Sequence, residues 1–142
     1  MILLDANVLI AGHRPADPRH EETRRFLDAL FAAPTAFTVP DIVLAAFVRI
    51  ATDPRILSPP TPLEEALDVA AAITSLPNHR RIAPGARHWE LFAQTCRAGD
   101  ARGPLVTDAS LAALAIEHGC ELLSFDRDFA RFPGLRWRPP VA

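Results

Sequence analysis

The sequence predicts an α/β fold in which one parallel sheet is covered by helices on both faces. Short apolar runs, such as residues 2–4 and 121–125, alternate with segments whose apolar residues recur at helical spacing. The chain has 142 residues, 49% of them hydrophobic, which is near the size of one domain and enough to bury a core. We find no internal repeat, low-complexity tract or change of composition, so we expect a single domain over residues 1–142.

In the first half of the chain, the aliphatic residues 2–4 predict a buried strand, and Asp5 and Asn7 then open a turn into a short helix. The spacing of apolar residues predicts helices over 8–11, 19–33, 42–51 and 63–73 and a strand over 36–39. Thr61 and Glu64 have the spacing of a capping box at the start of the fourth helix. Four prolines within 53–62 mark a connector, because proline interrupts helices and strands.

The second half repeats this alternation. Its apolar pattern predicts strands over 81–83, 105–106, 121–125 and 135–137, helices over 89–96 and 108–118, and a single helical turn over 129–132. Gly119 stands where a glycine commonly follows a helix end. Each strand that ends in an acidic residue is therefore expected to deliver it to the same edge of the sheet.

Three aspartates carry the functional hypothesis. Asp5, Asp108 and Asp126 each follow a short apolar run, and in an open α/β sheet the carboxyl ends of the strands face one crevice. Carboxylates gathered there repel one another unless a cation lies between them. Oxygen-only, carboxylate-rich sites suit Mg²⁺ or Mn²⁺. The pattern therefore predicts metal-assisted chemistry on a phosphate group.

Each aspartate also has a purely structural interpretation. Asp5 could form an Asx-turn, Asp108 could cap a helix, and Asp126 could start a turn. Their joint occurrence favours the site, since the sequence holds no glycine-rich phosphate loop, no Gly-x-Ser-x-Gly elbow and no Cys-x-x-Cys pair. A phosphatase-like reaction would need an Asp-x-Asp motif after the first strand, where the chain has Asp5-Ala6-Asn7.

Composition excludes other classes. A net charge of −2 argues against nucleic-acid binding driven by bulk charge. All 15 basic residues are arginine, which the codon bias of a GC-rich genome mostly explains, although the guanidinium group also suits phosphate. No run is long enough to cross a membrane, and the first residues lack the pattern of a signal peptide. We therefore expect a cytoplasmic protein in which Cys96 and Cys120 are reduced thiols.

Four segments together resemble PIN-domain ribonucleases, specifically VapC-type toxins of bacterial toxin–antitoxin pairs. They are Leu4–Ile10, Phe47–Arg55, Leu105–Ala115 and Ser124–Phe129. The resemblance implies a PIN-like three-layer α/β/α fold with a five-stranded parallel sheet. It also implies metal-dependent endonucleolytic cleavage of RNA of the tRNA or rRNA class with Mg²⁺ or Mn²⁺, a homodimer, and inhibition by a small cognate VapB-like antitoxin.

The resemblance assigns roles residue by residue. Asp5, Asp108 and Asp126 match the family's catalytic, metal-binding acids, while Asn7, Thr107, Asp128 and Arg49 take accessory places around them. The family's remaining acid usually begins a Glu-x-x-Arg motif, and here that position is Ala46. This departure leaves open whether one or two ions bind. The closeness of Asp128 to Asp126 in the sequence also leaves open which of the two is the closer ligand. The departure at Ala46 also leaves a second hypothesis, a catalytically weakened PIN domain that binds RNA or protein.

Overall fold

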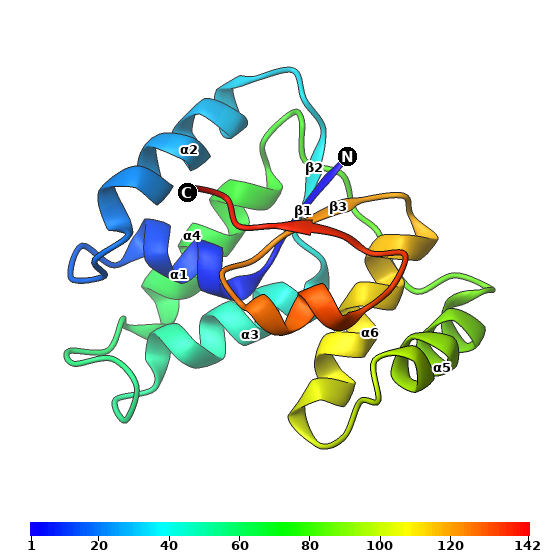
Figure 1. Cartoon of the computed structure of the whole chain (residues 1–142). Helices are drawn as coiled ribbons and strands as arrows, with labels where there is room; N and C mark the ends of the chain where they lie inside the picture. The colour runs from blue at the N-terminus through cyan, green and yellow to red at the C-terminus, as the bar shows by residue number, and fades with distance from the viewer.

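The computed structural model describes all residues from 1 to 142, and its centre is a four-stranded parallel sheet (Figure 1). The strands are β1 (Ile2–Leu4), β2 (Phe37–Thr38), β3 (Glu121–Leu123) and β4 (Arg136–Arg138), in the spatial order β2-β1-β3-β4. The helices are α1 (Ala6–His13), α2 (His20–Ala32), α3 (Asp41–Thr52), α4 (Leu63–Thr74), α5 (His88–Ala98), α6 (Pro104–Glu117) and the 3₁₀ helix η1 (Arg127–Arg131).

The order of the strands fixes where a site can form. The chain leaves β1 for β2 on one side and later returns to β3 on the other side of β1. This reversal is a topological switch point, and ligands of open α/β sheets bind outside the carboxyl ends of the strands there. Because Leu4 pairs with Leu123, the residues that follow them, Asp5 and Ser124, leave the sheet side by side.

Helices cover the sheet in two groups. α1 packs on α2 and α3, and α3 packs on α4, while α5 and α6 pack on each other. Figure 1 shows α1, α2 and α4 on one side of the strands and α5 and α6 on the other. Leu3, Leu4, Leu122 and Leu123 are fully buried between these layers, as expected for parallel strands covered on both faces. No helix is long and apolar enough to cross a membrane.

Three details of the expected secondary structure were wrong, and the sheet has four strands rather than five. Residues 105–106 form the first turn of α6 because Pro104, at the first helical position, already has the backbone angle of a helix. Residues 81–83 form no strand, and only an isolated bridge joins His79 to Phe37. The capping box is also absent, since α4 begins after Pro62 and the Thr61 hydroxyl lies 3.0 Å from Nε2 of His13.

The remaining expectations hold with small shifts of boundary. α3 begins directly after Pro40. The helical turn expected over residues 129–132 is the 3₁₀ helix η1, which begins two residues earlier, at Arg127. Gly119 has a φ of 65° just beyond the end of α6, where a residue with a side chain would be strained. The parallel α/β fold predicted from the alternating pattern is confirmed.

Candidate metal centre

Asp5 is the first residue beyond β1 and caps the start of α1. Its Oδ1 accepts a 2.7 Å hydrogen bond from the backbone N–H of Ala6. Its Oδ2 accepts from the Ser124 hydroxyl at 2.7 Å and from the side-chain amide of Asn7 at 3.3 Å. The carboxylate is therefore a helix cap, as the structural interpretation had it, and is also held in a fixed orientation at the switch point.

Ser124 ties the two central strands together at the site. Its buried hydroxyl donates to Asp5, accepts from the Asn7 amide at 2.9 Å, and accepts from the backbone N–H of Asp126 at 3.0 Å. These contacts use the one proton and both lone pairs of a hydroxyl. Oδ1 of Asn7 in turn accepts from the backbone N–H of Phe125 at 3.1 Å. The polar groups at the ends of β1 and β3 are thus locked in one orientation.

Sequence reasoning placed Ser124 in a motif without giving it a role. The role depends on the pairing of β1 with β3, which brings together residues 119 positions apart in the chain. A signal was present nevertheless, because Ser124 is a small polar residue directly after a buried apolar strand and directly before the acidic turn. Buried hydroxyls nearly always have hydrogen-bond partners, so such a residue implies a polar neighbour.

Asp108 reaches the site from within α6, because the strand expected directly before it, over residues 105–106, is the first turn of that helix. It lies one turn into the helix, after Thr107, which is exposed. One carboxylate oxygen from each of Asp108, Asp126 and Asp128 lies within 4.8 Å of the other two. Asp108 therefore stays in a helix, as expected, but that helix begins four residues earlier, and the carboxylates still converge.

Asp126 and Asp128 differ in their surroundings. Asp126 is half-buried and caps η1, where its Oδ1 accepts from the backbone N–H of Asp128 at 2.9 Å, whereas Asp128 is exposed. We expect Asp126→Asn to reduce metal-dependent activity more than Asp128→Asn, because an exposed carboxylate holds a cation more weakly in competition with water. Parallel metal titrations of both variants test the order, and a larger defect in Asp128→Asn would reverse the roles.

A cavity of about 250 Å³ opens beside the acids, between α1, α3 and α6. Asp5, Asn7, Thr107 and Asp108 line one part of it, and Ala46, Arg49 and apolar side chains of α3 line the other. Ala46 is half-buried, so the position where the resembled family carries Glu faces the same space as the acids. Arg49 is exposed at this cavity and makes no ion pair within the chain.

The pKa values of Asp108 and Asp5 are both raised, and repulsion from neighbouring acids is among the causes. Burial, and after it the neighbouring charges of Asp126 and Asp5, together raise the pKa of Asp108 from 3.8 to about 6. Burial also raises the pKa of Asp5, although its hydrogen bond from Ser124 opposes the rise. Burial and repulsion both make the negative charge of these carboxylates unfavourable. A divalent cation bound to their oxygens would offset both costs. The residues present therefore suit Mg²⁺ or Mn²⁺.

The raised pKa of Asp108 predicts a pH-dependent stability. Between about pH 4 and 6 the folded, metal-free chain keeps a proton on Asp108 that the unfolded chain releases, so this group stabilises the fold at low pH and the contribution disappears as pH rises through about 6. We expect metal binding to weaken below about pH 6, because protons compete for the same oxygen. Melting curves and Mn²⁺ titrations of wild type and Asp108→Asn at about pH 5 and about pH 8 measure both effects. If the two proteins show the same pH dependence, Asp108 has an ordinary pKa.

Comparison with known proteins places this arrangement in a family. The PIN-domain model matches residues 2–135. Ribonuclease VapC31 of Mycobacterium tuberculosis is 48% identical over 142 residues, covering 99% of this chain and 100% of the relative. Ribonuclease VapC25 of the same species is 44% identical over 142 residues, with the same coverage.

Solved structures share the fold at lower identity. VapBC2 from Rickettsia felis, bound to a DNA fragment from its promoter, superposes with a TM-score of 0.71 at 18% identity and covers 98% of both chains. VapC20 of Mycobacterium tuberculosis, described as a Sarcin-Ricin loop cleaving toxin, gives a TM-score of 0.66 at 20% identity, covering 96% of this chain and 99% of its own. With a matching family model and full-length relatives, the chain belongs to the PIN-domain family, among the VapC ribonucleases.

Proposed function

We propose that the chain is a metal-dependent endoribonuclease that acts as the toxin of a type II toxin–antitoxin pair. The observation that carries this proposal is the cluster of Asp108, Asp126 and Asp128 beside Asp5, at the switch point of a PIN fold. The VapC relatives, named as ribonucleases, supply the reaction class. The partners we propose are RNA, a small VapB-like antitoxin and a second copy of the chain, all in the cytoplasm.

The residues of the chain divide the work. Asp5, Asp108 and Asp126 would hold Mg²⁺ or Mn²⁺, and Ser124 and Asn7 keep the Asp5 oxygens in place. When bound, the ion supplies a hydroxide nucleophile at neutral pH and neutralises charge on the phosphate. Thr107 is exposed at the cavity and can orient a water molecule. Arg49, with no partner in the chain, can contact a phosphate of the RNA backbone.

Ala46 is the observation that favours the second hypothesis, an RNA- or protein-binding module of weak activity. It lines the cavity where the resembled family carries a carboxylate. A missing acid weakens the attraction for a second cation but leaves the other carboxylates in place. We therefore expect one ion to bind well and a second to bind poorly.

Ala46→Glu tests this expectation. The added carboxylate should lower the metal concentration for half-maximal cleavage by roughly tenfold, because affinity rises with the number of charged ligands. It should also lower the melting temperature of the metal-free chain, since another negative charge joins a repulsive cluster. Cleavage rates against Mg²⁺ and Mn²⁺, with melts in chelator, give both values. Unchanged values would mean that the new carboxylate does not reach the ion.

The biological role is tested by expression. The wild-type chain should arrest growth, and co-expression of the small protein encoded beside it should restore growth. Asp108→Asn, expressed at the same level, is the matched control and should not arrest growth. Arrest by both chains would show a toxicity that does not depend on the acids, and no arrest by either would contradict the toxin assignment.

A further inference from the structure

We propose that a second cavity, lined by Phe125 next to the turn that carries Asp126, holds one nucleobase of the RNA strand whose phosphate lies on the acidic cluster. The inference rests on the proposed function. The cavity measures about 480 Å³ and lies between the start of α2, η1 and the C-terminal residues. Its lining includes Arg19, Glu22, Phe125, Arg127 and Trp137.

The position of Phe125 joins this cavity to the metal centre. Its two neighbours belong to the centre, because the Ser124 hydroxyl bonds to Asp5 and the Asp126 carboxylate belongs to the metal-binding set. Asp5 and Asp108 face the other cavity, beside α3. A single strand that crosses the acids therefore has a cavity on either side for its flanking nucleotides, and Phe125 lines the one described here.

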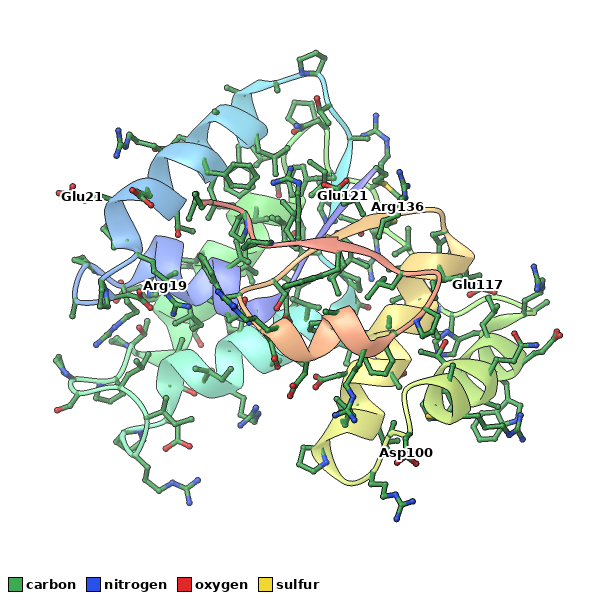
Figure 2. All side chains as sticks on the ribbon, viewed as in Figure 1. Arg19, Glu21, Asp100, Glu117, Glu121 and Arg136 are labelled. Carbon is green, nitrogen blue, oxygen red and sulfur yellow. The ribbon has the colours of Figure 1, made fainter.

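The walls of the cavity are planar groups held in fixed orientations. The guanidinium carbon of Arg19 lies 4.2 Å from the centre of the Phe125 ring. Asp17 holds that guanidinium with bonds of 3.0 Å from Nε and 2.9 Å from Nη2, and Figure 2 shows Arg19 at the start of α2. The indole N–H of Trp137 donates to the backbone oxygen of Ser124 at 3.1 Å. Aromatic rings and arginine planes are the groups on which unpaired bases stack.

Two charged groups at the cavity have no partner within the chain. Arg127 is exposed and makes no ion pair or hydrogen bond, so its charge is available to a phosphate of the same strand. Glu22 is also exposed and unpaired, and its carboxylate can only accept hydrogen bonds. A carboxylate accepts well from the amino group of cytosine. Uracil presents a carbonyl oxygen at that position, so we infer a preference for cytosine over uracil.

The matched probes are fluorescent 12-residue oligocytidylate and oligouridylate, whose bases differ only at C4, where the amino group of cytosine is replaced by a carbonyl, and at the neighbouring N3, which carries a hydrogen only in uracil. Binding to the wild-type chain is measured in chelator, which prevents metal-dependent cleavage, over a range of salt concentrations. We expect wild type to bind the cytidylate roughly fivefold or more tightly. Phe125→Leu should weaken binding of both probes by roughly fivefold or more at an unchanged salt slope.

Variants of the two charged residues are expected to change different properties of binding, its salt dependence or its preference between the probes. Arg127→Ala should reduce the salt slope by roughly 0.7, the value for one phosphate contact to a single strand. Glu22→Gln should make the two probes bind equally. Arg97→Ala, which removes an exposed and unpaired arginine from α5, is the matched control and should bind like wild type with only a small change of slope. Melting temperatures show that each variant is folded.

The outcomes separate this inference from the proposed function. If the wild-type chain binds the cytidylate probe more tightly but does not cleave RNA in Mn²⁺, the subsite is supported and the proposed nuclease activity is contradicted. If the wild-type chain cleaves RNA, but Phe125→Leu and Arg127→Ala bind both probes as tightly as wild type does, only the subsite is overturned. The subsite is also overturned if these variants retain RNA binding but lose the complex with the antitoxin, since the cavity would then be a protein-docking surface.

Discussion

Asp108→Asn is expected to reduce RNA cleavage to a barely detectable rate while making the metal-free protein more stable. Loss of one ligand from the cluster removes several kcal/mol of stabilisation of the transition state, which corresponds to a rate reduction of roughly a hundredfold to a thousandfold. The same change removes a negative charge that the fold disfavours, since the pKa of the Asp108 carboxyl group is raised to about 6. Because Asp108 is partly open to solvent, we expect a gain of only about 1 kcal/mol, or about 3 °C in melting temperature.

The measurement pairs melting curves with metal titration. In chelator at about pH 8, Asp108→Asn should melt above wild type, and addition of Mn²⁺ should raise the melting temperature of wild type much more than that of the variant. Asp28→Asn, a change on the exposed face of α2, controls for the loss of a charge elsewhere. A variant that is less stable than wild type and keeps the full metal response would show that Asp108 serves the fold and not the ion.

Ser124→Ala is expected to have the second largest effect, although this residue does not touch the proposed ion. Its hydroxyl bonds to Asp5, Asn7 and the backbone of Asp126, so its removal takes one hydrogen bond from each of these part-buried groups, at a cost of about 1–3 kcal/mol. The pKa of Asp5 should rise further, because the bond from Ser124 lowers it. Residues that orient metal ligands typically change metal affinity or activity by roughly 10-fold to 100-fold.

The distinguishing readout is recovery at high metal concentration. Ser124→Ala should regain much of its cleavage rate as Mn²⁺ is raised, since all the carboxylates remain, whereas Asp108→Asn should not. Ser110→Ala, a half-buried serine on α6 outside the network, is the matched control. If Ser124→Ala loses stability but keeps the wild-type metal midpoint, Ser124 is a structural residue only.

The sequence predicted those parts of the molecule that depend on local pattern. Asp5 follows β1 and Asp126 follows β3, as expected from the apolar runs before them, and the long amphipathic helices lie where their periodicity placed them. These predictions were correct because each feature depends on the burial of an apolar face within a single segment. Ala46 also lines the cavity beside the acids, as its match to the family's remaining acid implies.

The parts that were wrong or missing depend on contacts between distant segments or on very short elements. Leu105 and Val106 form a two-residue apolar run that fits a strand as well as a helix, and the preceding Pro104 was the signal that favours a helix. Strands of two or three residues leave little pattern, which explains the difference between the four strands observed and the five expected. The role of Ser124 required the pairing of β1 with β3, which no local pattern contains.

The most direct test of the central claim is cleavage of RNA by the purified chain in Mn²⁺, with chelator added midway and excess Mn²⁺ added later, beside the same series for Asp108→Asn. We predict that wild type produces discrete fragments with 5′-phosphate ends, stops in chelator and resumes when Mn²⁺ returns, while Asp108→Asn stays inactive throughout. Cleavage that continues in chelator, or that proceeds equally in Asp108→Asn, would contradict metal-dependent catalysis at this acidic cluster.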